Sequence, residues 1–249
     1  MEYNKLQWEI IAKKYDEERD SLSNSALLLD NIITEYFQKE QNCSVVVDYG
    51  AGIGTQSRLI SPFVTKIFAF EPVQEMRNIF VKHTNIVEYN NIALVDNSKE
   101  IHQQRNIDAI ICSKVFDHIL DVPVILMAMY DMLKPKGFLI LSLAHPIKYS
   151  GTWEKDNKGN YLYYKMDNYF TEGEIVRSRE NVSGNQFITE VRCQHRTIST
   201  YFNWITEAGF YVKKMIEPQA SLQAMEELPY LYAQASRIPN VLIFECHKQ

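Results

Sequence analysis

The segment from Val46 to Gly54 carries the strongest chemical signal in the chain. It reads VVDYGAGIG, so that an apolar run ends at Asp48 and is followed by Gly50, Ala51, Gly52 and Gly54. Glycine adopts backbone conformations that other residues avoid, and it lets a ligand or a following helix approach the main chain closely. Backbone amides of such a turn can face a ligand. The pattern predicts a cofactor-binding turn between a strand and a helix.

Glu71 provides the second part of the signal. It lies 21 residues after Gly50, at the end of the apolar run KIFAF. A carboxylate in this position can accept hydrogen bonds from both hydroxyls of a ribose. The glycine turn and Glu71 together indicate a cofactor that contains a nucleoside.

The spacing of the glycines helps to choose the cofactor. A dinucleotide fingerprint is GxGxxG, with a helix N-terminus aimed at a pyrophosphate, whereas this chain has GxGxG. The negative charge of Asp48 would oppose a pyrophosphate, but it suits an ammonium group such as the amino-acid end of a methionine-type cofactor. Both features disfavour an NAD-dependent oxidoreductase, which remains an alternative.

These residues resemble the class I S-adenosylmethionine-dependent methyltransferase family, whose first motif is similar to DxGxGxG and whose second strand ends in an acidic residue. The resemblance covers about residues 40–145 well and the ends more loosely. It implies S-adenosylmethionine as the cofactor, with Asp48 and the glycines along its methionine portion and Glu71 at its ribose. The other contacts that the resemblance implies are Pro72 and Met76 beside the adenine, Asn91, Ile92 and Ala93 after the third strand, Ser113, Val115 and His118 in the loop after the fourth strand, and Tyr15 on an N-terminal helix. Packing roles are open alternatives for Met76, His118 and Tyr15.

The acceptor side needs groups that align a nucleophile and, where it is protonated, remove its proton. In the resembling fold, the acceptor approaches above the carboxyl ends of the fourth and fifth strands. His145 follows the fifth strand and is the predicted general base, with a hydrogen bond at the strand exit as an equally open alternative. His195 and Arg196 form a second predicted group, in which Arg196 either orients an acceptor carboxylate or belongs to a solvated cluster at a helix start.

Other methyl-transfer chemistries lack their sequence signals. The chain has no NPPY-like tetrad, no Pro-Cys nucleophile, no Asp and Asn cluster for magnesium and no His/Cys grouping with zinc spacing. The HP pair, an aromatic insertion and the HRT segment resemble a bacterial small-molecule branch of the family. The prediction is therefore transfer to an oxygen or nitrogen of a small-molecule acceptor without a metal. A peptide or protein acceptor, and a non-catalytic S-adenosylmethionine-binding protein, remain alternatives.

The elements that position these residues follow from the apolar pattern. Strands are expected at 44–48, 66–71, 85–89, 108–113, 137–144, 210–217 and 240–248, with helical periodicity between most of them. The alternation predicts an α/β fold with a doubly wound, mostly parallel, Rossmann-like sheet of seven strands, the last of them antiparallel. We expect one domain, 1–249, with N-terminal helices in 1–43, a cofactor-binding core in 44–145, an aromatic lid in 146–196 and a C-terminal core in 197–249. Some aromatic residues of the lid are expected to form its own small core.

Composition excludes several classes of protein. With 46% hydrophobic residues and 23% charged residues, the chain can bury a full core and is not disordered. A net charge of -5 disfavours nucleic acid as a partner. Neither a membrane-spanning apolar run nor a secretory signal is visible, and the four cysteines are scattered without CxxC pairing, so we expect reduced thiols and a cytoplasmic location. These patterns leave the oligomeric state unspecified.

Overall fold

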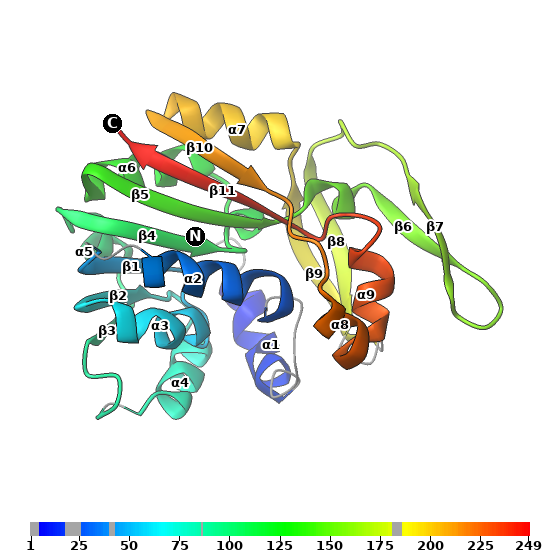
Figure 1. Cartoon of the computed structure of the whole chain (residues 1–249), viewed down its shortest axis with the longest axis horizontal. Helices are drawn as coiled ribbons and strands as arrows, with labels where there is room; N and C mark the ends of the chain where they lie inside the picture. The colour runs from blue at the N-terminus through cyan, green and yellow to red at the C-terminus, as the bar shows by residue number, and fades with distance from the viewer. Residues whose placement is uncertain (1–4, 18–25, 40–42, 86, 181–185) are drawn as a thin grey trace.

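A seven-stranded sheet forms the centre of the computed structural model, which describes residues 5–17, 26–39, 43–85, 87–180 and 186–249 (Figure 1). Its order is β10-β11-β5-β4-β1-β2-β3. The strands are β1 (Val45–Tyr49), β2 (Lys66–Phe70), β3 (Ile92–Val95), β4 (Ile107–Ser113), β5 (Leu133–Ala144), β10 (Phe210–Ile216) and β11 (Val241–Lys248). The pairings from β5 through β3 are parallel, and β11 is antiparallel to both β5 and β10. The predicted fold class is confirmed.

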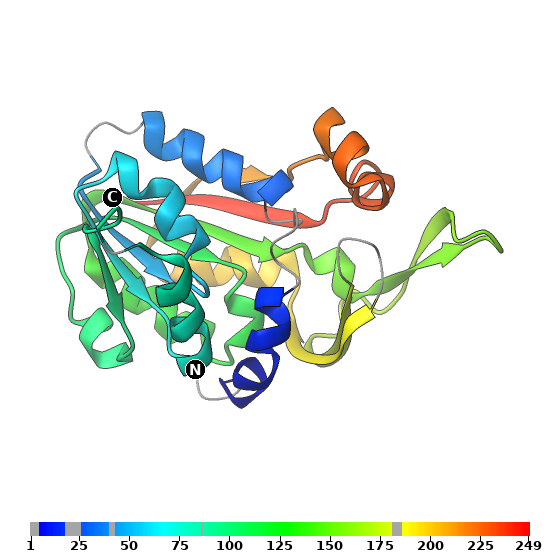
Figure 2. The ribbon, with the colours of Figure 1, turned by 90° about the horizontal axis from the view of Figure 1, so that it is seen from below.

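Helices cover both faces of the sheet. They are α1 (Lys5–Glu17), η2 (Ala26–Asp30), α2 (Asn31–Lys39), α3 (Thr55–Ile60), η3 (Ser61–Phe63), α4 (Gln74–His83), α5 (Ser98–His102), η4 (Phe116–His118), α6 (Val122–Met132), η5 (Pro146–Tyr149), α7 (Ile198–Glu207), α8 (Leu222–Glu227) and α9 (Pro229–Ala235). Along β4, Ile110 and Cys112 pack in the cluster that contains α5, α6 and α7, whereas Ala109 and Ile111 pack in the cluster that contains α2, α3 and α9. Figure 2 shows α2 and α3 along one face. Because both faces are buried, these strands read as continuous apolar runs.

Two β-hairpins form the segment between β5 and α7. They consist of β6 (Gly151–Lys155) with β7 (Tyr161–Met166), and of β8 (Gly173–Glu180) with β9 (Gln186–His195). Both views show the β6–β7 hairpin extending away from the sheet (Figures 1 and 2). The Trp153 ring packs edge-on against Tyr161 and Tyr164, and the Arg237 guanidinium lies 4.8 Å from the Trp153 ring centroid. These aromatic residues therefore hold their own hairpin together.

The third strand lies later in the chain than the sequence predicts. Residues 87–91 form turns, and the parallel ladder with β2 begins at Ile92. Val87 is exposed, and Asn90 and Asn91 are consecutive residues of a type that favours turns. The predicted strand at 85–89 is therefore wrong. Ile92 and Ala93 lie inside β3 instead of after it.

The four cysteines are buried and form no disulfide, which agrees with the prediction of reduced thiols. Across the described ranges, helices that combine the length and the apolarity required to cross a bilayer are absent. The helical periodicity of the N-terminal region predicts two helices with a break near residues 21–25, and this break lies outside the described residues.

Candidate cofactor and acceptor site

The glycine turn joins β1 to α3, and its three glycines differ in their surroundings. A Cβ atom on Gly50 would lie 2.4 Å from Val115 Cγ2, and one on Gly54 would lie 2.5 Å from the Phe80 ring. Gly52 has φ of +56°, and a Cβ atom there would meet no described atom within 4 Å. Gly50 and Gly54 thus allow close packing of the protein on itself, and Gly52 leaves the backbone open to a ligand.

The backbone amides of this turn are less available to a ligand than the sequence suggests. The N–H groups of Gly50 and Ala51 both donate to the carbonyl oxygen of Phe70, at 2.8 and 2.9 Å. The Gly52 N–H donates to Glu71 Oε2 at 2.8 Å. These bonds fasten the turn to the carboxyl end of β2, so the three amides position the turn.

Glu71 lies at the carboxyl end of β2, as predicted. Its side chain is buried, and Oε1 accepts a second backbone hydrogen bond from Val73 at 2.9 Å. Burial raises the pKa of Glu71 to about 7, although both backbone hydrogen bonds and Arg77 oppose the change. Each carboxylate oxygen can accept more than one hydrogen bond, so Glu71 can still receive ribose hydroxyls.

Asp48 is a second buried carboxyl group beside the turn. Ser57 Oγ donates to Asp48 Oδ2 at 2.6 Å, which links β1 to α3. Burial raises the pKa of Asp48 to about 6, and the hydrogen bonds from Ser57 partly offset this. Two buried carboxyl groups with raised pKa values give a site that a cationic ligand would stabilise in its ionised form.

The raised pKa of Glu71 predicts a measurable dependence of stability on pH. Between about pH 4.5 and pH 7, the folded chain keeps a proton on Glu71 that the unfolded chain has lost, so this group lowers the free energy of unfolding as pH rises. The expected slope is on the order of 1 kcal/mol per pH unit. Urea unfolding of the wild type and Glu71→Gln across this range measures the effect. The advantage of the wild type over the variant should shrink as pH rises; a constant difference would contradict the prediction.

The structure corrects the predicted adenine contacts after the third strand. The Asn91 amide donates to the carbonyl oxygens of Ser61 and Val64, both at 2.9 Å, at the amino end of β3. The glycine turn and Glu71 lie at the carboxyl ends of their strands, so Asn91 is at the opposite edge of the parallel sheet. Asp96 follows β3 and so lies at the carboxyl end of this strand. Its Oδ2 atom is 3.7 Å from Arg77 Nη2. The run IALVD was the signal for Asp96 that the sequence interpretation missed.

Other predicted cofactor residues lie near the turn. Gln56 donates to Ser113 Oγ at 3.0 Å, which connects α3 to the end of β4, and Val115 contacts Gly50. Pro72 follows Glu71 directly. Met76 is buried in a hydrophobic cluster with Ile53, so it has the packing role that the sequence left open.

Helix α1 packs against both α4 and the loop after β4. Glu9 accepts hydrogen bonds from the backbone N–H groups of Gln74 and Glu75, at 2.9 and 3.0 Å, and so caps the N-terminus of α4. The Trp8 ring contacts the His118 ring edge-on, with centroids 5.0 Å apart. Tyr15 belongs to α1, but its side chain lies outside the described part of the structure. The predicted N-terminal helix is therefore present and contacts the loop after β4.

His145 has both ring nitrogens engaged. Nδ1 accepts from the Ile147 N–H at 3.2 Å, and Nε2 hydrogen bonds to Glu217 Oε1 at 2.8 Å. Burial lowers the pKa of His145, and Glu217 partly offsets this. The geometry matches the alternative in which His145 fixes the strand exit.

His195 presents a different arrangement. Its Nε2 lies 2.7 Å from the carbonyl oxygen of Tyr169, so Nε2 carries a proton and donates it. Nδ1 is buried, and among the described residues it has no hydrogen-bond partner. The ring lies edge-on to Tyr149 and Tyr169, at centroid distances of 6.1 and 5.8 Å. This tautomer leaves Nδ1 with a lone pair that can accept a proton.

Arg196 is buried and donates to three backbone carbonyl oxygens around η4. Its partners are Phe116 at 2.8 Å, Ile119 at 2.6 Å and Leu120 at 3.1 Å. The guanidinium also lies 5.3 Å from the Trp204 ring centroid. A grip on an acceptor carboxylate would require the guanidinium to leave these carbonyls, and the predicted solvated cluster does not match its burial.

The comparison with protein families agrees with this geometry. Residues 16–214 match a family described as a methyltransferase domain, and the match covers well over half of the chain. The chain therefore belongs to this methyltransferase family. The family, enzyme class and cofactor class predicted from the sequence are confirmed at that level.

Individual relatives support the same fold. An uncharacterized protein from Haemophilus influenzae is 32% identical to this chain over 124 residues. The match covers 48% of this chain and 46% of the relative, so the chain spans about half of the relative's length. A candidate S-adenosylmethionine-dependent methyltransferase from Listeria monocytogenes has a TM-score of 0.70 at 22% identity, over 88% of this chain and 96% of its own. The N-methyltransferase NodS from Bradyrhizobium japonicum WM9, solved with S-adenosylhomocysteine, has a TM-score of 0.63 at 11% identity, over 99% and 98%. At these identities the two structures show the class I methyltransferase fold alone.

Proposed function

We propose that this protein transfers a methyl group from S-adenosylmethionine to an oxygen or nitrogen of a small-molecule acceptor. The observation that carries the proposal is the cofactor cradle, in which the open backbone at Gly52 lies beside the buried carboxyl groups of Asp48 and Glu71. The cofactor has a sulfonium and an ammonium group, and both suit two buried carboxyl groups whose ionised forms need a neighbouring cation. Its ribose hydroxyls can donate to Glu71.

The acceptor side supports a small molecule more than a peptide. Strand β9 packs against α1 and η4, where Ile11, Val191 and Cys193 form a buried cluster with Tyr149 at its edge. The polar groups on this side, His195 and Arg196, are also buried. Buried polar groups beside apolar side chains favour a small acceptor, because small-ligand sites are mostly apolar with a few precisely placed polar groups.

Within this site we assign the role of general base to His195. The Tyr169 carbonyl fixes the proton on Nε2, so Nδ1 can take the proton of an acceptor hydroxyl as the methyl group transfers, or the proton of an acceptor ammonium group before its nitrogen attacks. His145 and Arg196 are then positioning residues, because their polar atoms already bind Glu217 and the η4 carbonyls. This assignment differs from the sequence prediction, which favoured His145.

A turnover assay with labelled S-adenosylmethionine and a panel of small carboxylates, phenols and amines tests the proposal. His195→Gln keeps a side-chain N–H for the Tyr169 carbonyl but lacks a basic nitrogen, so turnover should fall by about 10²–10⁴ while affinity for S-adenosylhomocysteine stays unchanged. His145→Gln is the matched control and should lose far less turnover.

Three outcomes would contradict parts of the proposal. A turnover loss confined to His145→Gln would restore the sequence-based assignment of the base. Transfer to peptides alone would remove the small-molecule acceptor. Failure to bind S-adenosylhomocysteine would remove the cofactor assignment itself.

A further inference from the structure

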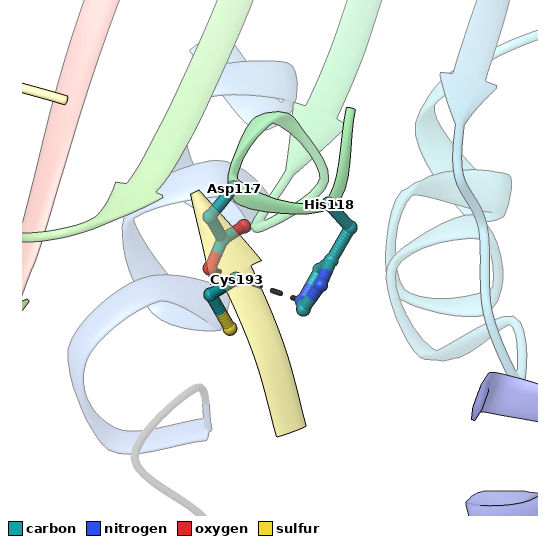
Figure 3. Close-up of side chains that lie close together, drawn as sticks. All are labelled: Asp117, His118 and Cys193. Atoms are coloured by element: carbon teal, nitrogen blue, oxygen red, sulfur yellow. Dashed lines mark ion pairs between the residues drawn. The ribbon is translucent and has the colours of Figure 1, made fainter. Parts of the chain in front are cut away.

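Three side chains with metal-binding chemistry meet between η4 and β9. Asp117 and His118 belong to η4, and Cys193 belongs to β9, so residues about 75 positions apart come together (Figure 3). One potential ligand atom from each lies within 4.8 Å of the other two. All three side chains are buried.

The donor atoms form a set that a borderline-soft cation prefers. Thiolate, imidazole and carboxylate are the ligands of Zn²⁺ in proteins, at about 2.0–2.3 Å from the metal, which places two ligands of a tetrahedral ion about 3.5 Å apart. His118 Nε2 already lies 3.8 Å from Asp117 Oδ2. This separation is already close to the one that a tetrahedral ion requires.

Asp117 gives an independent indication of a missing ligand. Its Oδ1 atom is buried and has no hydrogen-bond partner among the residues that the structure describes. The other oxygen, Oδ2, accepts a very short hydrogen bond from the Tyr149 hydroxyl. A buried carboxylate oxygen without a partner is costly, and a cation at this point would satisfy it. The Tyr149 hydroxyl would then orient the ligating carboxylate from the second shell.

We propose that Asp117, His118 and Cys193 bind one divalent transition-metal ion of the Zn²⁺ type. The thiol of Cys193 loses its proton to solvent when its sulfur bonds to the metal, so that a thiolate and a carboxylate balance the ionic charge. Three protein ligands leave the fourth tetrahedral position for water or for an acceptor heteroatom. The sequence predicted no metal because these residues lack the short spacings by which zinc sites are recognised.

The ion would connect the core to the second hairpin. Cys193 of β9 lies three positions before Arg196. The Arg196 guanidinium donates hydrogen bonds to backbone carbonyl oxygens around η4. Metal binding would therefore add a second link between the same two segments. Because a bound ion stabilises the folded state, the proposal predicts a higher melting temperature in the presence of the metal.

Titration of the full-length, chelator-treated protein with Co²⁺ tests the site directly. We expect one equivalent to bind with a thiolate-to-cobalt charge-transfer band, and we expect Zn²⁺ to displace it and to raise the melting temperature. Cys193→Ser should abolish the band, and Asp117→Asn should weaken Co²⁺ binding at least tenfold. Cys43→Ser, which makes the same chemical change at a buried cysteine outside the cluster, should leave both signals intact.

Two results would overturn the proposal. One is the absence of saturable Co²⁺ binding to the wild type, and the other is binding that Cys193→Ser and Asp117→Asn both retain. If Cys193→Ser does not fold, Asp117→Asn alone decides between these results. S-adenosylhomocysteine affinity measured on the metal-free protein keeps a failure of this site distinct from a failure of the proposed function.

Discussion

Replacement of Glu71 by alanine should lower the affinity for S-adenosylhomocysteine at least 100-fold. On the proposed function, the ionised carboxylate accepts both ribose hydroxyls, and a hydrogen bond to a charged group contributes about 1.5–3 kcal/mol. Loss of two such bonds corresponds to two or more factors of ten in the dissociation constant. Calorimetric titration of the purified chain at pH 8 measures the effect, since the pKa of about 7 leaves Glu71 mostly ionised there.

Glu71→Ala should also destabilise the fold, and this loss of stability must be distinguished from the loss of affinity. Glu71 accepts the N–H groups of Gly52 and Val73, and an alanine leaves both without this acceptor. We therefore expect the ligand-free variant to lose on the order of 1–3 kcal/mol of unfolding free energy as well. Glu71→Gln retains one oxygen acceptor and the side-chain volume, so it should lose less stability and still bind weakly. Wild-type affinity in Glu71→Gln would show that the carboxylate does not hold the ribose.

The parts of the site that the sequence predicts are those that a short segment determines. The glycine turn and the carboxyl group at the end of β2 each follow directly from the strand that precedes them. Because both faces of the sheet are buried, most strands also read clearly as apolar runs. The third strand is the exception, since NIVEY and NIALV have similar composition and only the pairing with β2 distinguishes them.

The roles of the acceptor-side residues depend on contacts between distant segments. The proton on His195 is fixed by the carbonyl group of Tyr169, 26 positions away, and the ring of His145 is fixed by Glu217, 72 positions away. Nothing near either histidine in the sequence specifies these partners. The possible metal ligands are hidden for the same reason, because β9 brings Cys193 to η4 only in the folded chain.

Replacement of Arg196 by alanine should destabilise the protein by at least about 3 kcal/mol. The guanidinium donates to three carbonyl oxygens around η4 in a buried environment, and each acceptor left unsatisfied costs about 1–3 kcal/mol. Urea unfolding measures the change. Arg196→Lys should recover only part of the loss, because an ammonium group cannot reproduce the planar arrangement of guanidinium donors. Arg192→Ala is the control on β9, the strand that ends just before Arg196, since the ion pair of Arg192 with Glu174 is exposed and contributes at most about 1 kcal/mol.

The kinetics of the Arg196 variants distinguish the two roles that the residue could have. If Arg196 positions η4, Arg196→Lys should lower turnover with every acceptor, because the loop after β4 contacts the glycine turn through Val115 and Arg196 through Phe116. If Arg196 instead grips an acceptor carboxylate, Arg196→Ala should unfold like the wild type, and KM should rise for carboxylate acceptors only. The three short hydrogen bonds to the main chain lead us to expect the first pattern. A selective rise in KM without loss of stability would return Arg196 to the role that its sequence position first suggested.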